Sequence, residues 1–193
     1  VDTIEVDLDG NTYKMREIQV NAPTKFSNGM IRPFGWGSQK QDNAYAQLTL
    51  GESALIANCG HEITVTNPVE VEGTTENPSA FYSYGNYNMT VSGNLTGTGY
   101  LKLRVQNDRQ FVVLSGNNGA FAGTVEIPAA ESGQGRRNYS NLSSDSASSA
   151  LATWIVTTGS KAADARIIAG SGTWKFGRLS GKPNLAGSAA TFT

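Results

Sequence analysis

Cysteine, histidine and proline are scarce in this chain of 193 residues, which holds one cysteine, one histidine and six prolines. With Cys59 alone, no disulfide can form within the chain. A tetrahedral metal site needs about four ligands, and Cys59 with His61 supplies too few. We therefore interpret Cys59 as a small buried hydrophobic side chain and expect no metal site and no cofactor.

Charge is also sparse. Charged residues make up 16 % of the chain, and the net charge is −1, against a usual charged fraction of ~25 %. No basic stripe runs along the sequence, so we expect no nucleic-acid partner. No apolar run approaches the ~18 residues that would span a bilayer. The chain opens at Val1 directly within a strand pattern, and we interpret it as a piece of a larger precursor with flanking domains.

Glycine and short alternating runs are abundant instead. The chain has 22 glycines in 193 residues, which exceeds the usual ~7 %. Apolar residues alternate with polar ones over short segments, as expected for half-buried strands, and no segment has the periodicity of an amphipathic helix. The predicted strands are at 4–8, 12–15, 46–50, 62–66, 88–92, 100–105, 124–127, 150–156, 166–168 and 173–176. The pattern predicts a single all-β domain over residues 1–193.

Turn residues subdivide this domain. Asp9-Gly10 lies between two alternating runs and predicts a hairpin. Residues 1–44 are expected to form this hairpin and an irregular N-terminal cap, and residues 45–193 to form the strand repeats. Residues 131–149 are expected to form a long loop with one helical turn near its end, capped by Asp145.

Two architectures fit strands that recur at short intervals. A short parallel β-helix stacks rungs so that each covers the core of its neighbour, and Asn and Gly at rung corners favour it. A β-sandwich or jelly roll is the alternative. In the β-helix, Leu114, Val125, Ile127, Trp154 and Phe176 are expected to fill the interior.

The run Leu114-Ser115-Gly116-Asn117-Asn118-Gly119-Ala120-Phe121-Ala122-Gly123-Thr124 carries a family resemblance. Together with Gly97-Thr98-Gly99, Ala152-Thr153-Trp154 and the segment 176–181, it resembles the repeat of bacterial autotransporter-associated β-strand proteins. The resemblance covers about residues 92–187. It implies a right-handed parallel β-helix on a secreted or cell-surface protein, and it implies no catalytic residues.

The aromatic segments are the candidate binding site. Residues 81–88 hold four aromatic rings and two asparagines, and residues 32–37 form a second aromatic, glycine-rich segment. Aromatic rings stack on the apolar faces of sugars, and amide and charged groups bind the hydroxyls. The residues predicted to bind glycan are Trp36, Tyr82, Tyr84, Asn86, Tyr87, Asn88, Asp108 and Arg109. The same tyrosines could instead cover the end of the core.

These observations predict that the protein is a non-catalytic extracellular module that binds glycan or mediates adhesion. A purely structural β-solenoid spacer is one alternative. A β-helical polysaccharide lyase or hydrolase is another, and it would need paired carboxylates. Alternation places Glu62, Glu70, Glu72 and Glu126 at separate solvent positions, so we do not expect an enzyme.

Overall fold

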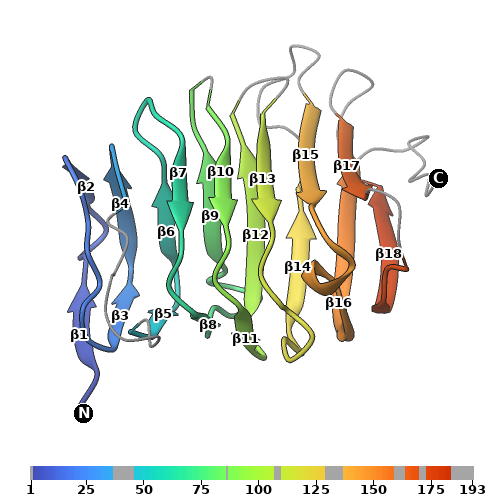
Figure 1. Ribbon diagram of the computed structural model, residues 1–193, viewed down its shortest axis with the longest axis horizontal. Coiled ribbons are helices and arrows are strands. Elements are labelled where there is room, and N and C mark those ends of the chain that lie inside the picture. Colours follow the sequence, from blue (N-terminus) through green and yellow to red (C-terminus); the bar gives the residue numbers. More distant parts are fainter. Residues whose placement is uncertain are drawn as a thin grey trace.

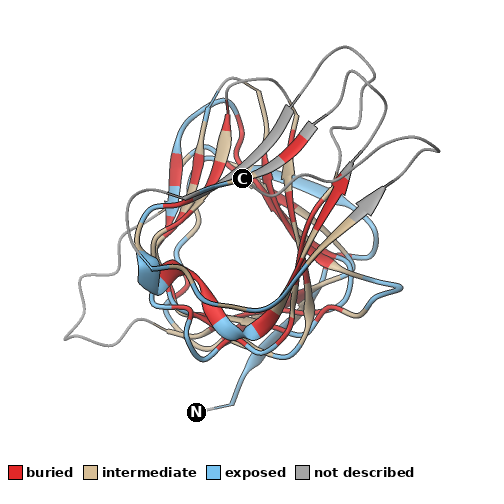
Figure 2. Cartoon of the chain, turned by 90° about the vertical axis from the view of Figure 1, so that its right-hand side faces the viewer, coloured by how far each residue is buried: buried red, intermediate tan, exposed pale blue. Residues whose placement is uncertain are grey.

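The chain folds as a parallel β-helix of about six turns. The computed structural model describes residues 2–36, 46–85, 87–106, 110–128, 137–158, 164–169 and 173–183. All described strand pairs are parallel, and the coils stack along one axis from the N-terminal end to the C-terminal end (Figure 1). Viewed along that axis, the coils superimpose around a closed outline (Figure 2). The parallel β-helix is therefore confirmed, and a sandwich of antiparallel strands is not formed.

Three sheets form the walls of the solenoid. Sheet A contains β1 (Ile4–Asp7), β3 (Thr24–Ser27), β5 (Leu48–Leu50), β8 (Val69–Val71) and β11 (Leu95–Gly97). Sheet B contains β2 (Thr12–Met15), β4 (Gly29–Pro33), β6 (Ala54–Ala57), β9 (Ser79–Ser83), β12 (Tyr100–Val105), β14 (Thr124–Ile127), β16 (Ser149–Thr158) and β18 (Phe176–Pro183). Sheet C contains β7 (Ile63–Val65), β10 (Met89–Val91), β13 (Phe111–Leu114), β15 (Arg137–Leu142) and β17 (Asp164–Ala169).

The interior is made of apolar ladders that run from coil to coil. Successive side chains of a strand point to opposite faces of its sheet, so every second position faces inward. In sheet C the register aligns Val65, Val91, Leu114 and Leu142, all fully buried. In the other two sheets the inward ladders include Leu48, Val69 and Leu95, then Ile56, Phe81 and Leu103.

The predicted core residues lie in these ladders. Leu114, Val125 and Ile127 are fully buried, and Trp154 is 1 % exposed. Phe176 is partly buried and packs edge-on against Trp154, with ring centroids 5.5 Å apart. All five positions are confirmed.

Asparagine side chains hold the corners by reaching into neighbouring coils. Asn67 is fully buried, and its amide donates hydrogen bonds to the carbonyl oxygens of Val20 (3.2 Å) and Ala46 (2.9 Å). Asn118 accepts a hydrogen bond from the backbone N–H of Leu95 (2.8 Å) and donates one to the carbonyl of Ala147 (2.9 Å). At these corners, the side chains form hydrogen bonds with backbone groups that are not paired by the hydrogen bonds between strands.

The corners differ in length. Sheet C passes to sheet A through residues 66–68 and 92–94, whereas sheet B passes to sheet C through the longer segments 58–62, 84–88, 106–110 and 128–136. The described parts of these B-to-C connections lie along the upper edge of Figure 1.

The predicted N-terminal hairpin is not formed. β1 pairs with β3 and β2 pairs with β4, both in parallel, so the turn at Asp9 and Gly10 is a corner between sheets A and B. Asp9 and Gly10 both have positive φ, at 49° and 70°, which is the same conformation that a tight hairpin turn requires. Residues 2–36 form the N-terminal end of the stack, with strands β3 and β4 in the part predicted to be irregular.

The predicted loop at 131–149 is also corrected. It contains strand β15 and a short 3₁₀ helix at Asp145–Ala147. The helical turn was expected, but the residue at its N-cap is Ser144, and no side chain caps it. Among the described residues, no helix is long and apolar enough to cross a membrane.

Candidate functional site

Three aromatic side chains from successive coils stack at the corner between sheets B and C. Phe34 follows β4, His61 lies between β6 and β7, and Tyr87 lies between β9 and β10. The ring centroids of Phe34 and His61 are 5.7 Å apart, and those of His61 and Tyr87 are 5.9 Å apart. Phe34 is 44 % and Tyr87 40 % exposed, and His61 is exposed as well. We call Phe34, His61 and Tyr87 the aromatic file.

A buried asparagine positions two members of this file. The Asn58 amide, fully buried, donates to the carbonyl oxygens of His61 (3.0 Å) and Tyr87 (3.1 Å). The Ser83 hydroxyl donates to the same Tyr87 carbonyl at 2.6 Å. Two adjacent connections are thereby tied to one another, and their rings project from a rigid backbone.

Beside the file, two arginines flank two tyrosines on the outward side of sheet B. The guanidinium carbon of Arg32 lies 3.8 Å from the ring centroid of Tyr84, and that of Arg104 lies 4.6 Å from the ring of Tyr82. Tyr82 and Tyr84 meet edge to face at 5.6 Å. Cations are attracted to the face of an aromatic ring at such distances. We call Arg32, Tyr84, Tyr82 and Arg104 the arginine–tyrosine stack.

The residues predicted to bind glycan lie in different surroundings. Tyr87 belongs to the aromatic file, and Tyr84 and Tyr82 belong to the stack, where Tyr82 is only 7 % exposed. Asn88 accepts a hydrogen bond from the backbone N–H of Phe111 at 2.9 Å, which is a corner contact between coils.

Trp36 is set deeper. It packs against the core, and its indole N–H donates to the side-chain oxygen of Asn67 at 3.0 Å. The remaining predicted residues, Asn86, Asp108 and Arg109, lie outside the described residues.

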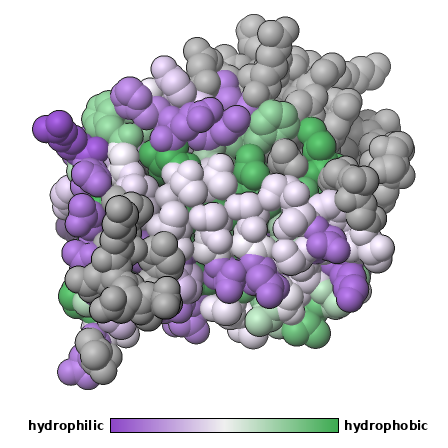
Figure 3. Space-filling model, in the orientation of Figure 1, coloured by the Kyte–Doolittle hydropathy of each residue, from purple (hydrophilic) through white to green (hydrophobic). Residues whose placement is uncertain are grey.

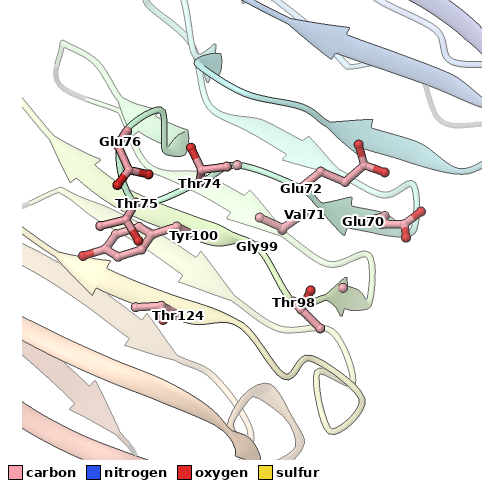
Figure 4. A pocket seen from close by; sticks show the side chains of 12 residues that line it. Glu70, Val71, Glu72, Thr74, Thr75, Glu76, Thr98, Gly99, Tyr100 and Thr124 are labelled. Carbon is pink, nitrogen blue, oxygen red and sulfur yellow. The ribbon is translucent and has the colours of Figure 1, made fainter.

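A concave region lies at the corner between sheets A and B. It is a cleft of about 660 Å³ lined by residues 70–76, 97–100 and 124. The carboxylates of Glu70, Glu72 and Glu76 are spread along its rim, with Glu70 and Glu76 at opposite ends (Figure 4). Glu72 pairs with the ammonium of Lys25 at 2.7 Å. Hydrolysis of a glycosidic bond needs two carboxyl groups facing one bond, and these three do not converge.

The expected exposed position of Glu126 is wrong. Glu126 is 8 % exposed and accepts hydrogen bonds from the hydroxyls of Tyr100 (2.8 Å) and Thr157 (2.9 Å), with Lys102 Nζ 3.6 Å away. Burial, together with the hydrogen bond to Glu126, raises the pKa of Tyr100 above its usual range. Alternation puts Glu126 on the outward side, but neighbouring coils cover it.

Cys59 and His61 do not form a pair of ligands. Cys59 is buried and His61 is exposed. Within the described ranges, no group of three or more His, Cys, Asp or Glu side chains could hold a metal ion.

Sequence reasoning missed the two arginines. Arg32, Tyr82 and Arg104 look unrelated in the sequence, because they are far apart along the chain. The signal that would have joined them is the length of a coil: positions 31, 56, 81 and 103 are aligned, so the residues that follow them share the outward side.

No protein-family model, curated protein or solved structure matches this chain.

Proposed function

We propose that this protein is a non-catalytic module that binds carbohydrate through the aromatic file. Support comes from one observation above all: three exposed rings from successive coils follow one another at centroid distances of 5.7 and 5.9 Å, and Asn58 fixes the two connections that carry His61 and Tyr87. Buried rings of this kind would simply extend the core. Exposed rings held in place leave apolar surface for a ligand.

The chemistry of the file suits sugar rings. A pyranose has an apolar face of C–H groups that stacks on an aromatic ring, and hydroxyls that need polar partners. The imidazole of His61 and the phenol of Tyr87 can donate and accept hydrogen bonds. Because the coils repeat at ~4.8 Å, the file offers successive contacts along the solenoid axis, which suits a chain of sugars.

The setting of the module is part of the proposal. We infer a secreted or cell-surface bacterial protein in which this solenoid is joined to flanking domains and contributes to adhesion. The supporting features are the low charge, the abundant Gly and Asn, and the resemblance to autotransporter-associated repeats over residues 92–187.

Glycan-array screening followed by calorimetric titration tests the proposal. We expect at least one glycan to bind, and Tyr87→Ala and Phe34→Ala each to raise Kd about tenfold, a loss of about 1.4 kcal/mol. Tyr13→Ala is the matched control, because Tyr13 on β2 is 47 % exposed and lies outside the file. A wild-type protein that binds no glycan, or a control that weakens binding as much as Tyr87→Ala, contradicts the proposal.

A structural spacer is the second candidate function. It is favoured by the corner asparagines, since Asn58, Asn67 and Asn118 use their side chains on contacts between coils. A spacer would keep its length and stability when Phe34 and Tyr87 are replaced, and it would bind no glycan in the same titrations.

A further inference from the structure

We propose that the aromatic file binds one extended chain of β-1,4-linked, equatorially joined hexoses, which lies along the solenoid axis and places about one sugar on each coil. This inference rests on the proposed carbohydrate function and names the linkage and the shape of the carbohydrate.

The direction of the ligand follows from the order of the three rings. Phe34, His61 and Tyr87 come from the connections of three successive coils, and successive coils are roughly 4.8 Å apart along the axis. The ring centroids are 5.7 and 5.9 Å apart, so the coil step accounts for most of each separation. A ligand that contacts all three rings therefore extends along the axis over two coil steps, which is roughly 10 Å.

The spacing of the rings favours one class of linkage. In a β-1,4-linked chain of glucose or N-acetylglucosamine, both bonds of each sugar to its neighbours are equatorial. Such a chain is extended and advances by about the length of one sugar ring per residue, which is close to one coil step. Successive sugars can therefore contact successive rings of the file. An α-1,4-linked glucan bends into a helix instead, so its sugars leave the file after the first contact.

The inclination of the rings distinguishes a free chain from a crystalline surface. The ring planes of Phe34 and His61 are inclined to each other by 58°, and those of His61 and Tyr87 by 30°. The flat surface of a crystalline polysaccharide would need coplanar rings in order to contact all three. A free chain can rotate about its glycosidic bonds and follow rings that are inclined to one another. The file is therefore suited to a free chain.

Hydrogen bonds hold the backbone of the file in place before a ligand binds. The backbone N–H of Phe34 donates to the carbonyl oxygen of Met15 at 2.9 Å. The amide of Asn58 donates to the carbonyl oxygens of His61 (3.0 Å) and Tyr87 (3.1 Å). Because these segments are already ordered, binding removes less conformational freedom.

The file combines apolar and polar atoms as a sugar chain does. Phe34 offers only ring carbons, whereas the imidazole of His61 and the phenol of Tyr87 also donate and accept hydrogen bonds. The face of the molecule in Figure 3 has a similar mixed character, because pale residues separate small hydrophilic and hydrophobic groups. Such a surface suits a ligand in which C–H groups and hydroxyls alternate.

Titration with hexasaccharides that differ in linkage tests the inference. The probes are cellohexaose and chitohexaose, which are β-1,4-linked, and maltohexaose, which is α-1,4-linked. We expect at least one of the β-1,4 probes to bind at least about tenfold more tightly than maltohexaose. Pull-down with crystalline cellulose and crystalline chitin should retain little of the protein, because the inclined rings cannot all contact a flat surface.

A series of β-1,4 oligosaccharides from two to six sugars counts the binding positions. Affinity for the wild-type protein should rise with each added sugar at least up to the trisaccharide. Phe34→Ala and Tyr87→Ala each remove one end of the file, so affinity should stop rising about one sugar earlier. Tyr87→Phe keeps the ring and should preserve the dependence on length. Tyr13→Ala is the control outside the file, at a side chain that is 47 % exposed, and thermal unfolding confirms that each variant is folded.

The outcomes separate the two proposals. If maltohexaose binds as tightly as the better β-1,4 probe, or if only glycans of other linkages bind, the linkage is wrong and carbohydrate binding remains. Retention on crystalline polymer without binding of the soluble oligosaccharides overturns the free chain. An affinity that does not rise with length, or an equal loss in Tyr13→Ala, overturns the placement along the axis. Binding of no glycan at all overturns both proposals.

Discussion

Single side chains set the alignment of the coils. The fully buried Asn67 accepts a hydrogen bond from Trp36 and donates to Val20 and Ala46, so one amide contacts several neighbouring segments. A hydrogen bond contributes modestly when made, but a buried group left without its partner costs about 1–3 kcal/mol. Buried asparagines such as Asn67 therefore contribute more to the register between coils than to the packing of the apolar core around them.

Asn67→Ala should destabilise the protein by about 3 kcal/mol, because it leaves the buried carbonyl of Val20, the partly buried carbonyl of Ala46 and the Trp36 N–H without their partner. Asn21→Ala, at an exposed asparagine, should change stability by less than about 0.5 kcal/mol. Urea unfolding followed by circular dichroism measures both. Similar losses in the two variants would show that Asn67 contributes no more than an exposed side chain.

Tyr100 makes stability depend on alkaline pH. Burial and the hydrogen bond to Glu126 raise the pKa of its phenol in the folded state, while the unfolded chain keeps a tyrosine pKa of about 10. A raised folded-state pKa stabilises the protein fully below the unfolded pKa. That stabilisation is lost as pH rises above about 10, because only the unfolded state readily releases the proton.

We therefore expect the free energy of unfolding to fall between about pH 9 and about pH 11, and the fall to be smaller in Tyr100→Phe. Tyr13→Phe, at a tyrosine that is 47 % exposed, should retain the full decrease. Urea titrations over this pH range give the comparison. Equal slopes in all three proteins would assign the decrease to other groups.

At the residue scale, the sequence was sufficient for the inward positions but not for all outward ones. Alternation correctly placed Leu114, Val125 and Ile127 inside. It failed for Glu126 and gave no sign that Tyr82 is buried, because both are covered by side chains of adjacent coils. Which side chains cover which depends on the register between coils, and one strand alone does not define it.

Among the structural elements, the corners are more constrained than the strands. Gly93, at the C-to-A corner, lies so close to the preceding coil that a Cβ would overlap the carbonyl oxygen of Asn67. Gly116 has the same relation to the carbonyl of Gly93. These glycines allow one coil to stack directly on the next.

Gly93→Ala should destabilise the protein by at least about 3 kcal/mol, since the obstacle is backbone that cannot move without disturbing the ladder. Gly119→Ala is the control, because its Cβ would meet only a side-chain oxygen of Asn117 at 3.5 Å. It should be nearly neutral. Thermal unfolding distinguishes the two, and a tolerated Gly93→Ala would mean that this corner can relax.

The positions of these strands were predictable from the sequence, but the pairing between strands was not always predictable. Ile4–Asp7 and Thr12–Met15 were both expected, yet the Asp9-Gly10 turn between them gave the wrong topology. At every such turn, the chain can either fold back as a hairpin or continue into the next sheet of the solenoid. Which of the two topologies forms depends on the strands of later coils that pair with β1 and β2. Here these strands are β3 and β4, and they are remote from the turn.

The whole molecule is a stack in which each coil contacts only its neighbours. Stability in such folds is close to a sum of coil and interface contributions. The central coils are covered on both sides, whereas each end strand of a sheet, such as β2 and β18 in sheet B, pairs with one neighbour among the strands that the structure describes.

Native-state hydrogen exchange should therefore be slowest in β6, β9 and β12 and faster in β2 and β18. We expect a difference of at least about 100-fold, or about 2.8 kcal/mol. Backbone amides in the same sheet provide the comparison within one sample. Uniform rates from end to end would show that the solenoid opens as one cooperative unit.

The corners of the solenoid differ in length, and this difference affects where the sequence of the protein can change. Tight passages such as 66–68 and 92–94 tolerate little, whereas the B-to-C segments 58–62 and 84–88 are longer and carry exposed residues. Insertions, foreign epitopes or diversified peptides grafted into that one edge should leave the architecture intact. The rings of His61 and Tyr87 sit on this permissive edge, so the same scaffold could acquire new specificities there by changing a few residues at a time.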